Sequence, residues 1–159
     1  MKVGILSDSH DNLTNLKKAL GLFERERVDL VLHGGDYVAP FSVGPLAALT
    51  VPWWGVLGNN DGEVVGIFQK SDKKISLPFL DKEVQGYRIW LSHYPQPAEL
   101  AFQSDKYQLV VYGHTHRALI EREGNSFLIN PGETCGLLSG RSTVAICDLT
   151  EKVAKILDI

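Results

Sequence analysis

Short apolar runs alternate with helical patterns over most of the chain. Apolar runs with the length of buried strands occur at residues 2–6, 28–32, 53–57, 88–92 and 109–112. Between the first two runs, apolar side chains recur at helical spacing, at Leu13, Leu16, Leu20 and Phe23. Asp11 or Asn12 is placed to cap this helix. The chain therefore begins with a β-α-β unit.

The same reading predicts helices at residues 41–49 and 97–105, the second with Pro97 near its first turn. After residue 117 the pattern changes to short strands, LIERE, SFLIN, STVAICDL and KVAKILDI, separated by turn residues. We expect these strands to be antiparallel. Because no linker, repeat or low-complexity stretch interrupts the pattern, residues 1–159 are predicted to form one α/β domain.

Composition narrows the class of protein. Hydrophobic residues make up 44% of the chain and charged residues 22%, and no apolar run approaches the roughly 18 residues that a membrane span needs. The first residues turn polar too early for a signal peptide, and Cys135 and Cys147 lack the spacing of metal ligands. We therefore expect a cytoplasmic protein. A net charge of −3 with interspersed signs gives no nucleic-acid footprint and no membrane-binding patch.

All histidines of the chain follow predicted strands. They are His10, His33, His93, His114 and His116. The ends of the first three strands also supply carboxylates and amides, namely Asp8, Asp36, Asn59, Asn60 and Asp61. In open α/β sheets, ligands bind beyond the carboxyl ends of the strands, where neighbouring loops converge. These polar side chains are therefore predicted to meet at one edge of the sheet.

The residue types at this edge suit a transition metal. Imidazole nitrogen together with carboxylate and amide oxygen favours Mn, Fe, Ni, Zn or Co, and the absence of thiolates argues against a closed structural zinc site. The side chains are too many for one ion, whereas two ions that share a carboxylate would use them well. Such dinuclear centres are suited to phosphoryl chemistry. Glycines before Asp36, Asn59 and His114 allow the sharp turns that this arrangement needs.

In this order, the motifs resemble those of the calcineurin-like metallophosphoesterases. They are Asp8-Ser9-His10, Gly35-Asp36, Gly58-Asn59-Asn60-Asp61, His93 and Gly113-His114-Thr115-His116. The resemblance is greatest to the small, single-domain prokaryotic phosphodiesterases, and it covers essentially the whole chain, including Asn130-Pro131-Gly132-Glu133. It implies two packed, mixed β-sheets flanked by helices, in a four-layer α/β/β/α sandwich.

The resemblance also implies a site and a reaction. It assigns Asp8, His10 and His116 to one divalent ion, Asn59, His93 and His114 to a second, and Asp36 as the bridge between them. Mn or Ni is favoured, and Fe, Zn, Co or Mg would also fit. The implied activity is hydrolysis of small phosphate diesters by in-line attack of a hydroxide that bridges the metals. The alternative is a catalytically weak, metal-binding scaffold of the same fold that acts in protein interaction, and the chain could also form a homo-oligomer.

A haloacid-dehalogenase-like phosphatase is excluded, because the residue two positions after Asp8 is His10 and not a second carboxylate. Two departures from the family pattern affect the chemistry. Asn60 stands where many relatives have histidine, and Tyr94-Pro95 follows His93 where others have Gly-His. As a catalytic residue, Asn60 can bind a phosphate oxygen but cannot supply a proton near neutral pH.

The sequence leaves the roles of three further residues at this edge undecided. His33 is equally well interpreted as a partner that supports a ligand or as a plain buried histidine. Asp11 is better interpreted as a helix cap than as a catalyst. Asp61 is placed either to orient its loop or to accept a hydrogen bond from a ligand histidine.

Overall fold

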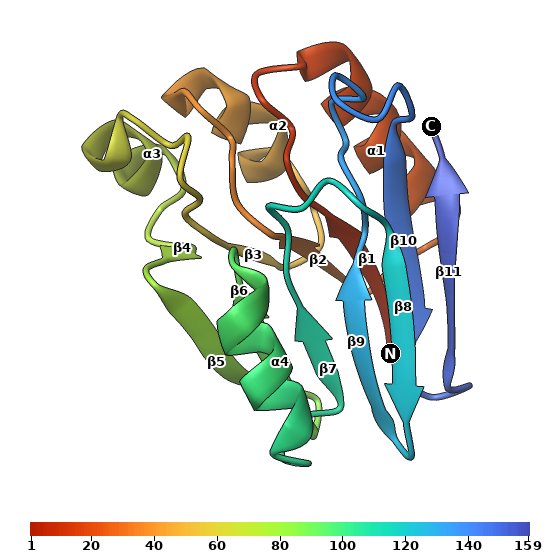
Figure 1. Cartoon of the computed structure of the whole chain (residues 1–159). Coiled ribbons are helices and arrows are strands. Elements are labelled where there is room, and N and C mark those ends of the chain that lie inside the picture. The colour runs from red at the N-terminus through yellow and green to blue at the C-terminus, as the bar shows by residue number, and fades with distance from the viewer.

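Two β-sheets pack face to face in the computed structural model, which describes residues 1–159 (Figure 1). The first sheet has six strands, in the spatial order β11 (Val153–Asp158), β10 (Thr143–Asp148), β1 (Lys2–Leu6), β2 (Leu30–His33), β3 (Trp53–Val56) and β4 (Ile75–Ser76). Strands β1 to β4 are parallel, whereas β10 runs antiparallel to both β1 and β11. The first sheet is therefore mixed.

The second sheet has five strands, in the spatial order β5 (Phe79–Val84), β6 (Tyr87–Ser92), β7 (Leu109–Val111), β9 (Ser126–Asn130) and β8 (Leu119–Glu123). Its three inner strands are parallel, and its two edge strands are antiparallel to their neighbours. The carboxyl ends of the parallel strands in both sheets lie at the same, upper edge in Figure 1.

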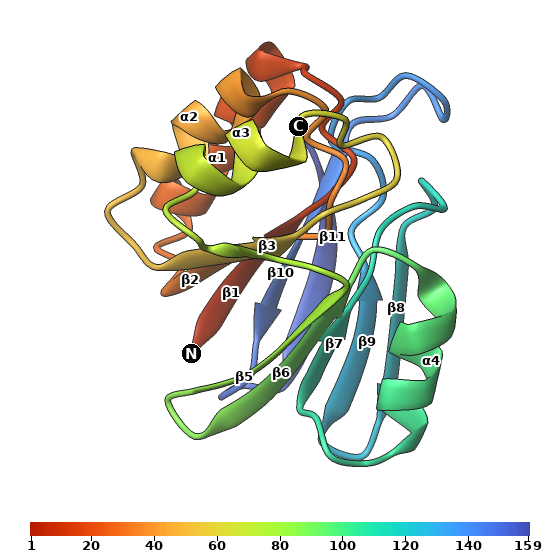
Figure 2. The same ribbon diagram turned by 90° about the vertical axis from the view of Figure 1, so that its left-hand side faces the viewer.

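Helices cover the outer face of each sheet (Figure 2). The first sheet carries α1 (Leu13–Arg25), the 3-10 turn η1 (Pro40–Val43), α2 (Gly44–Ala47) and α3 (Val64–Lys70), and the second carries α4 (Pro95–Gln103). A buried cluster that includes Val3, Ile5, Leu91 and Val111 fills the space between the sheets. Because the members of this cluster are apolar, burial of their surface stabilises the packing of the two sheets. The predicted four-layer α/β/β/α sandwich is confirmed.

The predicted strands and the first helix are confirmed to within a few residues. Asn12 caps α1, because its side chain accepts the backbone N–H of Asn15. Instead of one helix at 41–49, Pro40 begins a 3-10 turn, and a single α-turn follows from Gly44 with Pro45 in its first positions. The helix predicted at 97–105 begins two residues earlier, at Pro95.

Three elements were not predicted: α3, β4 and β5. The α3 sequence, VVGIFQK, combines β-branched residues with a glycine, so its helical period is weak. β5 is an edge strand with alternating exposed positions and three charged residues in FLDKEV. The strands after residue 117 pair antiparallel with one another as expected, in β8–β9 and β10–β11, but β9 also pairs in parallel with β7, which was not expected. No helix of the structure has the length and apolarity needed to cross a membrane.

Candidate metal centre

The loops that follow β1, β2, β3, β6 and β7 meet at the upper edge of the two sheets (Figure 1). Contacts between side chains connect the predicted ligands into two groups, and the stacked rings of His10 and His116, with centroids 5.3 Å apart, join the groups into one cluster. The contacts are Asp8–His116 at 3.5 Å, His10–Asp36 at 3.6 Å, Asp36–His93 at 3.5 Å, His93–Asn59 at 2.9 Å and Asn59–His114 at 2.8 Å. The convergence predicted from strand ends is therefore present in the fold.

Asp36 lies at the centre of the cluster and is almost completely buried. Its Oδ2 atom is 3.6 Å from Nε2 of His10 and 3.5 Å from Nε2 of His93. Gly58 makes this position accessible, because a Cβ atom there would collide with the Asp36 carboxylate. One carboxylate oxygen thus faces histidines from both halves of the cluster.

The half that contains His93 has its nitrogen lone pairs directed inward. Nδ1 of His93 donates to the carbonyl oxygen of Gly34 at 2.8 Å, which leaves Nε2 without a proton in the neutral ring. Burial lowers the pKa of His93, which favours that neutral form. Nε2 of His93 and Nδ1 of His114 both approach Oδ1 of Asn59. Acceptor atoms therefore converge where a cation would satisfy them.

The other half contains Asp8, His10 and His116. Nδ1 of His116 donates to Oε2 of Glu133 at 2.7 Å, so its Nε2 lone pair faces Asp8. Nε2 of His10 is buried without a hydrogen-bond partner. Since a buried polar atom without a partner is costly, this atom needs a ligand that the protein chain does not provide.

The charges of the cluster also favour the binding of a cation. Asp8 and Asp36 are both buried, and their ion-pair contacts are with histidines rather than with lysine or arginine. Burial raises the pKa of Asp8 to about 7, despite hydrogen bonds that favour the charged form. Buried carboxylates are normally paired or bound to a metal. The donor set, the burial and the unsatisfied nitrogen all fit divalent metal ions.

Backbone conformation sets this geometry. Left-handed φ angles occur at Asp8, His10, Asp36, His114 and His116, with values between 40° and 66°. Non-glycine residues rarely adopt such angles, and they concentrate at functional sites where the surrounding fold holds them in place. The turns after the strands therefore direct these side chains into the cluster, and their left-handed backbone conformations cost some free energy.

The three open residues support the loops and do not join the cluster as ligands. Asp61 accepts backbone N–H groups of Asp36, Val38 and Gly58, so it orients two loops at once. Oδ1 of Asp11 accepts the backbone N–H of Ala39 and the hydroxyl of Ser42. The expectation that Asp11 caps the helix that follows it, α1, was therefore wrong.

His33 is fully buried. Its Nδ1 accepts the backbone N–H of Gly35 at 3.1 Å, and its Nε2 therefore donates to the Ser9 hydroxyl at 3.0 Å. Burial lowers the pKa of His33 to about 3, with further contributions from His93 and His10. The neutral ring thus ties together the loops that carry Asp8, His10 and Asp36.

Asn60 contacts the cluster through hydrogen bonds to Asp36. Its backbone N–H donates to Oδ1 of Asp36 at 2.8 Å, and its side-chain Nδ2 donates to Oδ2 at 2.7 Å. Both oxygens of the central carboxylate are therefore held by one residue, and the amide oxygen of Asn60 has no partner within the chain.

Sequence reasoning missed the roles of Glu133 and Cys135. Glu133 is fully buried and accepts from His116, Cys135, Leu138 and Ser139. Although burial acts to raise it, hydrogen bonds from Ser139 and His116 hold the pKa of Glu133 below its usual range. The thiol of Cys135 lies in one group with His10 and His116. The only signal in the sequence was the Asn-Pro-Gly-Glu motif, to which no role was assigned.

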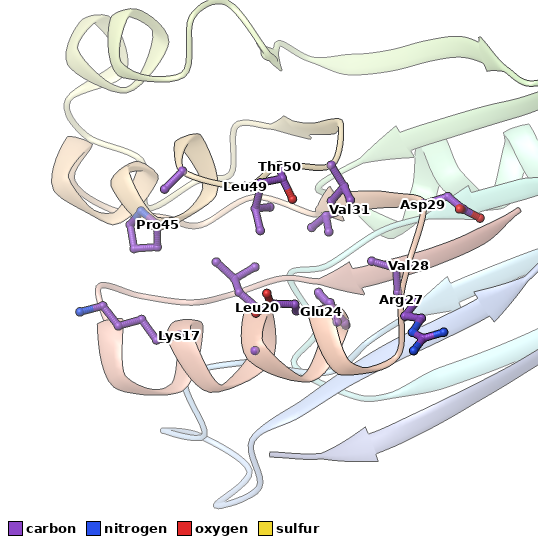
Figure 3. Close-up of a pocket in the computed structure, with 14 residues that line it drawn as sticks. Lys17, Leu20, Glu24, Arg27, Val28, Asp29, Val31, Pro45, Leu49 and Thr50 are labelled. Atoms are coloured by element: carbon purple, nitrogen blue, oxygen red, sulfur yellow. The ribbon is translucent and has the colours of Figure 1, made fainter.

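A separate cavity of about 660 Å³ lies between α1 and residues 45–51 (Figure 3). Leu20 and Leu49 contribute to its apolar wall, and Lys17, Glu24 and Arg27 supply charged groups. None of the predicted ligands lines this cavity, which is on the helix-covered face of the first sheet. The candidate metal centre lies instead at the edge of the two sheets.

Comparisons with known proteins agree with this geometry. Residues 1–152 match the calcineurin-like phosphoesterase superfamily domain. The chain is 35% identical over 158 residues to phosphodiesterase MJ0936 of Methanocaldococcus jannaschii, with 96% of this chain and 95% of that protein covered. A solved archaeal phosphodiesterase superposes with a TM-score of 0.91 at 34% identity, over 100% of both chains.

A more distant solved structure shares the fold alone. Vacuolar protein sorting 29 from Cryptosporidium parvum superposes with a TM-score of 0.73 at 17% identity, over 99% of this chain and 96% of that chain.

Proposed function

The chain belongs to the calcineurin-like phosphoesterase superfamily, and on that premise we propose that it is a metal-dependent phosphodiesterase. Its substrates would be small phosphate diesters, which it would hydrolyse by in-line displacement of one alcohol with the help of two divalent ions. The observation that carries the proposal is the position of Asp36 Oδ2 between Nε2 of His10 and Nε2 of His93. A carboxylate shared in this way is the bridge that a dinuclear centre requires.

The proposed ligands fall into two sets joined by Asp36. Asp8, His10 and His116 would hold one ion, and Asn59, His93 and His114 would hold the other. When bound, the ions would stabilise charge on the phosphoryl oxygens and lower the pKa of water, so that a hydroxide nucleophile is available near neutral pH. This assignment is supported by the inward lone pairs of His93 and His116 and by the unpartnered Nε2 of His10.

The residues of the chain have distinct tasks in this proposal. Glu133 and Gly34 hold the rings of His116 and His93 in the tautomers that leave Nε2 free. Asn60 restrains both oxygens of Asp36 and presents an amide beside the reacting phosphate. Because an amide cannot donate a proton to an alkoxide, departure of the leaving group depends on its own acidity. Cys135 and Cys147 are free cysteines, which agrees with a reducing, cytoplasmic setting.

The proposal is tested with metal-stripped protein that is reloaded and assayed on bis(4-nitrophenyl) phosphate. We expect about two ions per chain by elemental analysis and turnover only after reloading. Asp36→Asn should lose bound metal and turnover. The control Asp158→Asn, which removes an exposed ion pair with Arg141, should keep bound metal and turnover.

Full metal content and full activity in Asp36→Asn would contradict the assignment of the bridge. Stable uptake of metal without hydrolysis of any diester or monoester would instead favour the alternative, a binding scaffold of the same fold.

A further inference from the structure

Tyr94 is an exposed aromatic residue at the lip of the metal centre. It follows the proposed ligand His93 directly, and 45% of its surface is exposed. Its ring makes edge-on contacts with the ring of His93, at 5.3 Å and 72°, and with that of His114, at 4.8 Å and 64°. Both of these histidines contact Asn59. The Tyr94 ring therefore stands beside the half of the centre that contains Asn59.

The backbone holds Tyr94 in a fixed place. It is the N-cap residue of α4, with an extended conformation at φ −85° and ψ 147°. Pro95 restricts the residue before it to this region. The hydroxyl of Ser92 donates to the carbonyl oxygen of Tyr94 at 3.1 Å. An exposed ring that is already ordered loses little conformational entropy when a ligand binds to it.

The chemistry of the side chain indicates what it would recognise. A phenol ring offers an apolar, electron-rich face and carries no positive charge that could neutralise additional phosphates. Aromatic rings bind planar groups by stacking, and this is tolerant of the exact identity of the planar group. The contacts with His93 and His114 are edge-on and not parallel stacks, and 45% of the Tyr94 surface remains exposed for a ligand.

We propose that Tyr94 is a specificity-determining residue that stacks on an aromatic ester group, either an aryl group or a nucleobase, of the phosphate compound bound at the metal centre. The substrate class is then phosphate diesters with one planar aromatic substituent. This inference rests on the proposed function, because it places the phosphorus atom at the metal centre. It adds a selection among diesters that the metal ligands alone do not provide.

The test compares diesters that share 4-nitrophenolate as the leaving group and differ in the retained group. In the phenyl and thymidine 5′ esters, the ring-bearing substrates, the retained group carries a ring, whereas in the methyl ester only the leaving group does. The measured quantity is the ratio of kcat/KM for ring-bearing over methyl substrates. We expect this ratio to exceed one in the wild type and to fall about tenfold in Tyr94→Leu, as expected for loss of one stacking contact.

Tyr94→Phe should keep the ratio, because it retains the ring. Leu100→Ala is the matched control, since Leu100 is an exposed apolar residue of the same loop–helix segment that the centre does not use. Metal content and Tm are measured for each variant, so that a change in the ratio is separated from loss of the site.

A second measurement does not depend on turnover. Calorimetric binding of phenylphosphonate and methylphosphonate to metal-loaded protein should show the same preference and the same loss in Tyr94→Leu. An unchanged ratio in Tyr94→Leu, or an equal fall in Tyr94→Phe, would overturn the stacking role. Absence of diester hydrolysis by metal-loaded wild type would refute the proposed function, and the phosphonate ratio would then decide the role of Tyr94.

Discussion

Nδ1 of His116 donates a 2.7 Å hydrogen bond to Oε2 of Glu133, a carboxylate that is completely buried. The other donors to Glu133 come from Cys135 and from residues 138 and 139 of the following loop. The bond fixes the tautomer and orientation of the imidazole, and so its Nε2 atom faces Asp8. Glu133 therefore links a proposed metal ligand to a surface loop.

Replacement of this carboxylate should weaken metal binding without a change in any ligand. In Glu133→Gln the amide NH₂ group, itself a donor, would face the hydrogen-bond donors that now bind the carboxylate. The charge-assisted hydrogen bond from His116 would also be lost. We expect metal affinity to fall about 10- to 100-fold, measured by competition with a chelator. Glu121→Gln, at an exposed position of β8, is the control. Equal affinities of the two variants would show that Glu133 does not orient His116.

Leaving-group acidity should control the rate of the wild-type protein, because Asn60 is no proton donor and is held by Asp36. Loss of a general acid typically costs about 10² to 10⁴ in rate. We expect nitrophenyl diesters to be cleaved well, alkyl diesters slowly and simple monoesters poorly. Asn60→His should accelerate alkyl substrates more than nitrophenyl ones, because only a basic alkoxide gains much from a proton.

The measurement is kcat/KM over diesters graded by leaving-group pKa, for wild type, Asn60→His and Asn60→Ala. The alanine variant shows the effect of removing only the side-chain hydrogen bond to Oδ2 of Asp36, since the backbone N–H of residue 60 still donates to Oδ1. Equal acceleration of every substrate by Asn60→His, or a flat wild-type series, would mean that proton donation is not limiting.

Activity should rise more with Mn²⁺ or Ni²⁺ than with Mg²⁺. Imidazole nitrogens make up much of the proposed ligand set, whereas Mg²⁺ prefers oxygen ligands and retains several waters. The check is a titration of metal-stripped protein with each ion at matched concentrations, in which both bound metal and hydrolysis are followed. A clear optimum with Mg²⁺ would show that the histidines are not ligands.

Stability of the metal-free protein should contain an acid-sensitive contribution from His33. Burial lowers its pKa from 6.5 to about 3. Between these values the unfolded chain binds a proton that the folded chain excludes, so stability falls as the pH falls through this window. The slope from this residue is at most about 1.4 kcal/mol per pH unit.

Urea unfolding of wild type and His33→Gln at several pH values between 7.5 and 4.5 measures this contribution. Burial raises the pKa of Asp8 to about 7, which acts in the opposite direction, so the difference between the two proteins isolates His33. We expect that difference to change below pH 6.5 and to be constant above it. Parallel curves at every pH would contradict the assignment.

The convergence of the proposed ligands could be predicted from the sequence because each lies in the stretch that follows an apolar run. His93 and His114, for example, come after β6 and β7, whose boundaries were nearly correct. Glu133 could not be placed in the same way. It follows β9, and an antiparallel β9 would carry it to the opposite edge, whereas parallel pairing with β7 brings it to His116. Strand direction depends on long-range pairing, which local patterns do not encode.

The edge contacts of Tyr94 likewise depend on the packing of two histidine rings from different strands. Elements with weak periods, such as α3 and β5, were missed because their stability comes from contacts with the rest of the fold, including Ile67 in the helix-side core and Phe79 stacked on Trp90.

β1 is the first strand of the chain, yet its second edge is covered only by β10, where Lys2 pairs with Asp148. The loop that carries Glu133 is also hydrogen-bonded to the backbone of Ser7 and Asp8. During synthesis, Val3 and Ile5 of β1 are therefore made early, but their pairing with β10 is possible only after most of the chain has been synthesised. Meanwhile the open strand is available to pair with other nascent chains. The first sheet therefore cannot be completed until residues 143–148 have been synthesised and β10 has covered the edge of β1.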